Sequence, residues 1–186
     1  MGELNLVKKK ISINELCQVS IFTVIIAISA QIIIPMPYGV PMTLQTFAIP
    51  LAGFVLGMKK GTAATFVYIL LGAVGIPVFA GFAGGIGIVF GRTGGFILAF
   101  PFMALVAGIG AKKNNYLWLT LWLLVGVIVL YTSGMLMFSL ITSSDLMTSL
   151  TFVVIPFIPA EIIKIVMVVS LGKLIKKSLK KSGLLT

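Results

Sequence analysis

Long, nearly uninterrupted apolar segments dominate this chain and constrain its fold more than any other feature. The first of them runs from Leu16 to Ile34 without a charged residue. A helix needs about 20 apolar residues to cross a bilayer, where every backbone polar group must be bonded within the protein. Hydrophobic residues make up 59% of the sequence and charged residues 10%, whereas soluble domains carry about 25% charged residues. The sequence therefore predicts an all-α integral membrane protein.

Six membrane spans are predicted, and they form a single membrane domain over residues 1–186. The second span is short and follows a connection rich in proline and glycine. Pro156 and Pro159 divide the last span, so we expect its main helix to begin near Pro159, where a missing N–H costs nothing. The predicted spans are residues 16–34, 43–57, 62–79, 95–111, 117–141 and 150–175.

Lysines stand at the ends of these spans, and their distribution predicts the orientation. They cluster at 8–10, 59–60 and 112–113, and again between 173 and 181. With six spans, these four places lie on one side of the membrane. Because basic residues concentrate in cytoplasmic connections, we expect both termini in the cytoplasm of a multi-pass plasma-membrane protein. The formal net charge of +10 is then explained by the membrane and does not call for a nucleic-acid partner.

Two ionisable residues, Glu161 and Lys164, interrupt the last apolar segment. A charge at the centre of a membrane helix costs roughly 2.5–3.5 kcal/mol on insertion scales, so such residues are functional candidates. They are three residues apart and share one face of a helix. Glu161 precedes Lys173 by twelve residues, or about 18 Å of helix, which places the pair in the outer half of the bilayer. The simpler alternative is that the two charges only neutralise each other.

Polar groups from other segments are expected at the same level. Thr43 and Gln45 begin a span at the outer side, although they could instead cap that helix. Arg92 lies in the glycine-rich segment 80–95, which is too apolar for a solvated linker, and we interpret this segment as a lid. Arg92 could alternatively be a charge of the outer surface. Two cations facing one carboxylate favour an anionic ligand, whose body would contact Phe79, Phe90 and Gly94. The predicted ligand site is therefore near the extracellular side.

Several classes of function are excluded by residues that the chain lacks. It has no histidine, one cysteine (Cys17) and no phosphate-binding loop of the G-x-x-x-x-G-K-[ST] type. The four acidic residues are dispersed along the sequence. We therefore expect no enzyme activity, no metal site and no cofactor.

Four blocks of the sequence resemble a known family. VPMTLQTFAIPLAGFVLG at 40–57, YILLGAVGIPVFAG at 68–81, GRTGGFILAF at 91–100 and IPAEIIKIVMV at 158–168 are similar to blocks of the biotin-specific substrate-binding (S) components of energy-coupling factor (ECF) transporters, the BioY family. The chain departs from the family pattern at two places. Ala160-Glu161 stands where Gly-Asp is common, and Arg92 stands in a loop that often reads G-P-T-G-G.

The resemblance implies high-affinity capture of biotin from outside the cell by the substrate-specific subunit of an ATP-driven vitamin importer, in a bacterium. It also implies docking onto a membrane coupling (T) component and two cytoplasmic ATPase subunits. In related S components, small residues of the first helix contact the coupling component, which here suggests Ala27 and Ala30. The residues leave two alternatives open, a self-contained secondary carrier for an anionic vitamin-like solute and an assembly subunit without a ligand.

Overall fold

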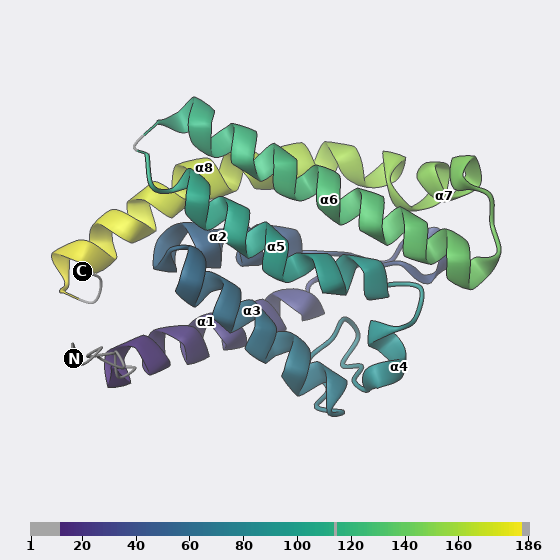
Figure 1. Cartoon of the computed structure of the whole chain (residues 1–186), viewed down its shortest axis with the longest axis horizontal. Helices are drawn as coiled ribbons and strands as arrows, with labels where there is room; N and C mark the ends of the chain where they lie inside the picture. Colours follow the sequence, from purple (N-terminus) through teal and green to yellow (C-terminus); the bar gives the residue numbers. More distant parts are fainter. Residues whose placement is uncertain (1–11, 114, 184–186) are drawn as a thin grey trace, which may run out of the picture.

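The computed structural model describes residues 12–113 and 115–183 of the chain, which form a bundle of helices (Figure 1). The predicted lysines at 8–10 lie outside the described residues. Two short antiparallel strands, β1 (Ile33–Ile34) and β2 (Met42–Thr43), pair within the connection between the first two long helices. The helices are α1 (Ile13–Gln31), η1 (Pro37–Gly39), α2 (Gln45–Leu56), α3 (Met58–Ala73), α4 (Ile86–Val89), α5 (Gly94–Gly110), α6 (Tyr116–Thr142), α7 (Leu146–Val153), η2 (Ile155–Phe157) and α8 (Ile158–Lys181).

The all-α prediction is confirmed, and the helices coincide with the predicted apolar segments to different degrees. Three described helical stretches are long and apolar enough to cross a membrane, namely 13–31, 116–142 and 146–179. Helices α2 and α5 are apolar but shorter. The last stretch is interrupted at the predicted prolines, where α7 ends, η2 makes one turn and α8 begins at Ile158.

Helix α3 ends six residues before the predicted end of its segment, and a glycine explains the difference. Gly75 adopts a positive φ of 102°, a conformation that glycine reaches without steric cost. Its N–H donates to the carbonyl of Gly72, and the N–H of Ile76 donates to the carbonyl of Leu71. These two bonds form a Schellman motif, which satisfies the last carbonyls of the helix. The chain therefore leaves the helix at Val74.

The predicted lid segment, residues 80–95, contains more regular structure than the sequence indicated. Phe79 and Ala83 pair as an isolated bridge, α4 makes one turn, and α5 begins at Gly94. The amide of Gln31 on α1 anchors the start of this segment, since its Nε2 donates to the carbonyl of Phe79 (3.1 Å) and its Oε1 accepts from the N–H of Phe82 (2.9 Å). The segment thus has one end attached to α1 and the other continuous with α5.

Helix α5 lies at the centre of the bundle, in contact with α2, α3 and α6. Glycines allow the close approach of the backbones. A Cβ atom at Gly53 of α2 would overlap the carbonyl oxygen of Ala104, and a Cβ atom at Gly95 would overlap the carbonyl of Ser133 on α6. At these positions the helix backbones touch directly, without side chains between them. Small residues allow the same close approach between membrane helices in general.

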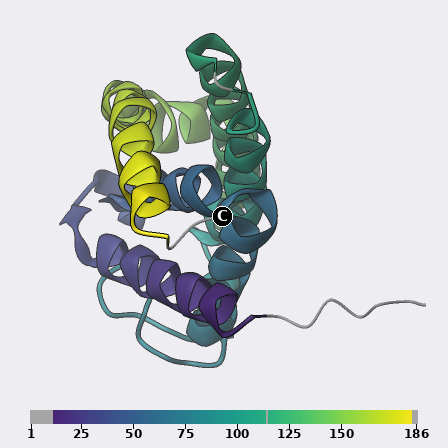
Figure 2. The same cartoon turned by 90° about the vertical axis from the view of Figure 1, so that its left-hand side faces the viewer.

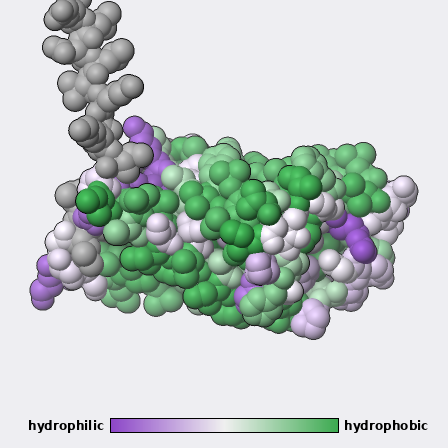
Figure 3. Space-filling view, turned by 90° about the horizontal axis from the view of Figure 1, so that it is seen from below, coloured by the Kyte–Doolittle hydropathy of each residue, from purple (hydrophilic) through white to green (hydrophobic). Residues whose placement is uncertain are grey.

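The outer surface of the bundle is largely apolar. In the view from below, hydrophobic residues cover the middle of the molecule and hydrophilic residues are found mainly toward its two ends (Figure 3). Isoleucines, leucines and phenylalanines on the outside are more than half exposed, among them Ile28, Phe66, Leu70 and Ile128. Exposed apolar belts of this extent mark a surface that is covered by lipid rather than by water.

We predict that replacing Gly53 by alanine destabilises the bundle by about 1–3 kcal/mol, because the added methyl group overpacks the contact with Ala104. Gly87→Ala is the matched control, since no atom lies within 4 Å of a Cβ atom at that position. Thermal unfolding of both variants in the same detergent measures the difference. Equal melting temperatures would contradict the proposed role of the backbone contact.

Candidate functional site

A cavity of about 290 Å³ is lined by residues of α2, α3, α4, α5, α6, η2 and α8 and of the connections before α2 and after α3. Helix α4, which carries the lining residue Ile88, lies at the end of the molecule away from the two termini (Figure 1). The size of the cavity is close to the lower limit of about 300 Å³ for ligand pockets. Most of its wall is aromatic or aliphatic, with polar side chains on one side. The lining consists of Gly39, Val40, Pro41, Thr43, Gln45, Thr46, Tyr68, Phe79, Ala80, Ile88, Thr93, Phe96, Ile97, Phe100, Leu130, Tyr131, Phe157 and Lys164.

Lys164 provides a positive charge to this cavity and is firmly held. Its Nζ donates to the backbone carbonyl of Thr43 and to the hydroxyl of Thr46, both at 2.8 Å. The Glu161 carboxylate lies 3.6 Å from the same nitrogen. This pair is the sole salt bridge among the described residues. The one-turn spacing on α8 therefore brings the two charges together, as the sequence predicted.

Glu161 lies behind this lysine and outside the cavity lining, with 2% of its surface exposed. Its Oε2 accepts hydrogen bonds from the hydroxyls of Thr46 (2.9 Å) and Tyr131 (3.2 Å). Its Oε1 has no hydrogen-bond partner in the described part of the chain, although it is buried. Buried polar atoms of native proteins usually have a partner. The carboxylate therefore holds Lys164, Thr46 and Tyr131 together from behind the cavity wall.

A second polar group is formed by Gln45, Thr43 and Tyr68. The Nε2 of Gln45 donates to the Tyr68 hydroxyl (2.7 Å), and its Oε1 accepts from the Thr43 hydroxyl (3.1 Å). All three side chains line the cavity. The backbone N–H of Gln45 also donates to Thr43 Oγ1 (3.3 Å), so these residues take part in the start of α2 as well as facing the cavity.

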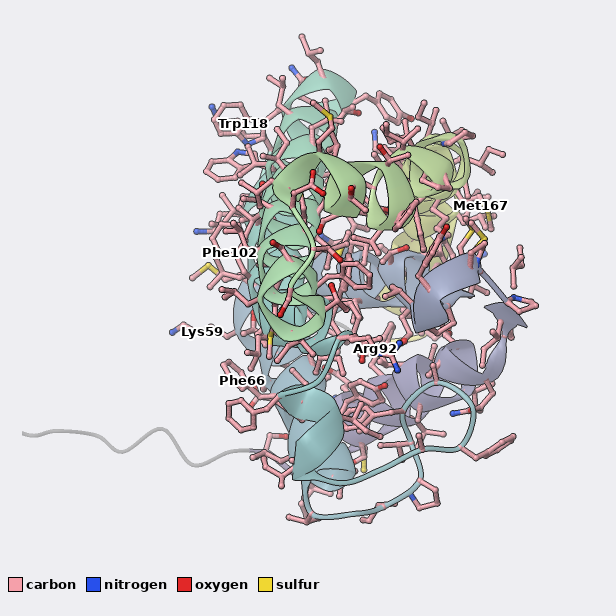
Figure 4. All side chains as sticks on the ribbon, turned by 90° about the vertical axis from the view of Figure 1, so that its right-hand side faces the viewer. Lys59, Phe66, Arg92, Phe102, Trp118 and Met167 are labelled. Atoms are coloured by element: carbon pink, nitrogen blue, oxygen red, sulfur yellow. The ribbon has the colours of Figure 1, made fainter. Side chains whose placement is uncertain are left out.

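Arg92 is exposed at the rim of the cavity and does not line it. Its guanidinium is 3.5 Å from the carbonyl oxygen of Tyr38 and touches the position of Gly39, which does line the cavity. The ring of Tyr38 stacks on Phe152 of α7, with centroids 3.6 Å apart. Seen from this end of the molecule, Arg92 lies centrally between the helices, whereas Phe66, Phe102 and Trp118 point outward (Figure 4).

The remaining predicted ligand contacts are divided between the cavity and its surroundings. Phe79 lines the cavity, is 2% exposed and packs edge-on against Tyr68. Phe90 is 61% exposed and is not among the residues that line the cavity. Gly94 is buried where α4 meets α5 and α6, because a Cβ atom there would overlap the Val89 carbonyl and approach Met137. The structure therefore does not bring Phe90 or Gly94 to the cavity.

Ala27 and Ala30, the two alanines predicted to contact the coupling component, lie on the side of α1 that faces the bundle. Ala30 has no exposed surface and Ala27 is half-buried, since this side of α1 packs against the rest of the bundle. The open side of α1 carries Ile21, Val24 and Ile28, each more than half exposed. Helix polarity alone did not distinguish the two sides, because both are apolar.

Sequence reasoning missed four lining residues that carry or support the site: Thr46, Tyr68, Tyr131 and Phe157. A usable signal existed for Tyr131, which places a hydroxyl within a long apolar helix of 27 residues. Polar side chains within membrane segments are expensive and commonly functional. Phe157 stacks edge-on against Tyr131 and carried no comparable signal.

We predict that Thr46→Val destabilises the protein by about 1–3 kcal/mol, because Glu161 loses a donor and Lys164 loses an acceptor inside the bundle. Thr62→Val is the matched control, since the Thr62 hydroxyl is buried without a hydrogen-bond partner in the described residues. Thermal unfolding without ligand compares the two variants. A loss of stability in Thr62→Val as large as that in Thr46→Val would contradict the assigned network.

Comparison with known proteins gives a consistent result. Residues 6–181 match the BioY family. A protein of Pyrococcus horikoshii described as "Probable biotin transporter BioY" is 40% identical over 151 residues, which are 81% of this chain and 89% of the relative. The "Biotin transporter BioY" of Thermotoga maritima is 36% identical over 165 residues, 88% of this chain and 96% of the relative.

A solved structure extends the similarity to the fold. It is described as the S component for biotin from an ECF-type ABC transporter, and it superposes with a TM-score of 0.80 at 29% sequence identity, covering 88% of this chain and 90% of its own. The similarity therefore includes the bundle that forms the cavity as well as the sequence blocks. This chain belongs to the BioY family.

Proposed function

We propose that this protein is the substrate-specific subunit of an ECF vitamin importer and captures biotin from outside the cell with high affinity. The observation that carries this proposal is the charged and hydroxyl-rich cluster around Lys164 in the wall of a mostly apolar cavity. Biotin combines a polar ureido ring, an apolar body and a carboxylate. A membrane protein that lined a cavity only for packing would have no need to bury such a cluster.

In the proposed topology the chain crosses the membrane six times, in a single domain with both termini in the cytoplasm. Lys59, Lys112 and Lys173 then lie at the cytoplasmic end, in agreement with the distribution of basic residues in membrane proteins. The cavity lies at the opposite, extracellular end. There the irregular segments before α2 and after α3 line the cavity, and irregular backbone at membrane depth is tolerated in such places.

Charge balance indicates how biotin lies in the cavity. Lys164 is compensated by Glu161 at 3.6 Å, so the inner cluster is close to neutral and offers both donors and acceptors. Arg92 at the rim forms no salt bridge among the described residues. An anion gains more beside an uncompensated cation than beside an ion pair. The carboxylate is therefore placed at Arg92 and the neutral ureido ring at the cluster of Lys164, Thr46 and Tyr131.

The apolar body of biotin would lie between these two ends, against Phe79, Phe96 and Phe157. The segment 80–95 closes over it from the extracellular side. Ile88 of α4 belongs to the cavity wall, and closure of an apolar segment over the ligand removes further surface from water, at roughly 25 cal/mol per Å². This segment would then control the release of the ligand.

Transport itself requires the membrane coupling component and two cytoplasmic ATPase subunits. The chain contains no phosphate-binding loop for ATP, so the energy would come from these partners. The exposed side of α1, with Ile21, Val24 and Ile28, is the part of that helix available to the coupling component. A self-contained carrier would instead move the solute without ATPase partners, and uptake into vesicles with and without them separates the two mechanisms.

Titration of the purified protein with biotin and with its neutral amide tests both the function and the orientation. We expect Arg92→Gln to weaken biotin binding about tenfold to hundredfold, as for a lost bond to a charged group, and to leave binding of the amide unchanged. Lys164→Gln should weaken both ligands by about 30-fold to 4,000-fold, because a buried polar cluster loses a member. Lys59→Gln, at the other end, is the control.

Lys164→Gln leaves the Glu161 carboxylate buried without its cationic partner. The double variant Glu161→Gln/Lys164→Gln removes both charges and nearly preserves the volume of the two side chains, so it is the neutral replacement for the pair. Absence of biotin binding in the folded wild-type protein would refute the proposed function and favour an assembly subunit without a ligand. Equal losses of biotin and of its amide in Arg92→Gln would refute the orientation alone.

Protection of cysteines tests closure of the segment 80–95. In a Cys17→Ser background, Ile88→Cys should react more slowly with an aqueous thiol reagent when biotin is bound, because its side chain faces the cavity. Phe90→Cys is the matched control in the same segment, since this position is 61% exposed and should react at the same rate in both states. Unchanged labelling of Ile88→Cys in protein that binds biotin would mean that the segment is static.

A further inference from the structure

A second cavity, of about 450 Å³, lies at the opposite end of the molecule from the proposed biotin site. Its lining comes from the connection between α5 and α6, the start of α6, the last turns of α8 and α2. These segments lie at the end of the molecule that faces the viewer in Figure 2. Lys164 lines the first cavity and Lys173 lines the second, nine residues further along the same helix, which corresponds to about 14 Å. The two cavities therefore belong to different levels of the bundle and do not share a lining residue.

Five lysines converge on this second cavity from two segments distant in sequence. Lys112 and Lys113 follow α5, and Lys173, Lys176 and Lys177 belong to α8. Among the described residues that line it, none is an aspartate or a glutamate. Ammonium groups gathered in this way repel one another, and an anion between them reduces that repulsion. The arrangement therefore favours a ligand with concentrated negative charge.

Aromatic rings position several of these lysines and mark the depth of the cavity. The Nζ of Lys113 lies 4.0 Å from the ring centre of Trp118, and the Nζ of Lys173 lies 3.1 Å from that of Tyr116. Both distances are within the range of cation–π interactions. Tryptophan and tyrosine concentrate at the level of the lipid headgroups. Trp118 is half-buried beside Trp122, so these rings suit a position of this end of the bundle at the headgroup level.

The floor of the cavity is apolar, in contrast to its rim. Phe54 of α2, Ala111 and Leu119 form it, and the Nζ of Lys176 lies 5.1 Å from the ring centre of Phe54. Gly172 allows α8 to approach this phenylalanine closely, because a Cβ atom there would lie 2.7 Å from Phe54 Cδ1. A basic rim above an apolar floor matches a phosphate joined to a glycerol and acyl chains better than a free inorganic ion.

We propose that this cavity binds the phosphate headgroup of an anionic phospholipid of the cytoplasmic leaflet. Basic pockets between membrane helices on the cytoplasmic side bind such headgroups. An acidic surface of a protein partner would satisfy the lysines but not the apolar floor at membrane depth. The proposal rests on the membrane topology given above and is independent of the identity of the ligand in the first cavity.

Native mass spectrometry of the purified protein with phosphatidylglycerol, and with phosphatidylcholine as the zwitterionic comparison, tests this site. Wild-type protein should retain phosphatidylglycerol at least about tenfold more strongly. Lys173→Gln/Lys177→Gln should reduce that affinity about thirtyfold, since each basic residue near anionic lipid contributes roughly one factor of five. Lys59→Gln/Lys181→Gln removes the same charge from exposed positions outside the cavity and should change the affinity less than about threefold.

The other outcomes overturn the proposal in distinguishable ways. Equal losses in the two double variants would indicate diffuse surface charge, and displacement of the lipid by inorganic phosphate at equal concentration would indicate a site for a soluble anion. Unchanged lipid binding with loss of the ATPase or coupling partners would identify a protein-docking surface. Thermal unfolding of the same variants reports their folding independently, and if the double variant does not fold, Lys177→Gln alone, at an exposed position, should still cost about fivefold.

Discussion

The buried pair of Glu161 and Lys164 is the interaction on which the functional end of the molecule depends. Removing two charges from water costs several kcal/mol for each ion, and attraction between them offsets this only with good geometry and further hydrogen bonds. Thr46, Tyr131 and the carbonyl of Thr43 supply those bonds from α2, from α6 and from the strand before α2. The same contacts that stabilise the charges also hold these three segments around the cavity, so the position of α8 and the shape of the site are coupled.

The cavity exists because the bundle is packed tightly elsewhere. Gly53 and Gly95 bring α2 and α6 into backbone contact with the central helix α5. At the end of the bundle that holds the first cavity, the connections between the helices are irregular. There the wall is completed by the hairpin of β1 and β2, by α4 and by η2 instead of by long helices. Close glycine contacts thus join the helices, whereas these shorter elements complete the wall of the first cavity.

The two cavities differ in the balance of charge, and this difference suits two kinds of ligand. In the first cavity a carboxylate compensates the inner cation, so a neutral polar ring can be held by directed hydrogen bonds. In the second, lysines gather from α8 and from the connection after α5, so a concentrated anion is favoured with little demand on its orientation. Basic clusters of this kind suit the headgroup level of a membrane, where lipid phosphates are available.

Much of the protein's character followed from its sequence. The apolar segments, the terminal lysines and the one-turn spacing of Glu161 and Lys164 indicated a helical membrane protein with a charged pair on one face of α8, because periodicity and burial of charge are local properties. Four sequence blocks indicated the family. The break of the last segment was also predicted, since proline acts on its own backbone.

Only the tertiary structure decided which neighbours meet. The cavity brings together three hydroxyl-bearing residues from three helices, Thr46, Tyr68 and Tyr131. No local sequence pattern relates these residues to one another. Phe90 is exposed while Ile88 two residues earlier faces the cavity, and Ala30 is buried while Ile28 is open. In an apolar chain the inner and outer faces have similar composition, because lipid and core are equally apolar. Which side of a helix forms the site therefore depends on packing. That packing is set by contacts between residues that are distant in the sequence.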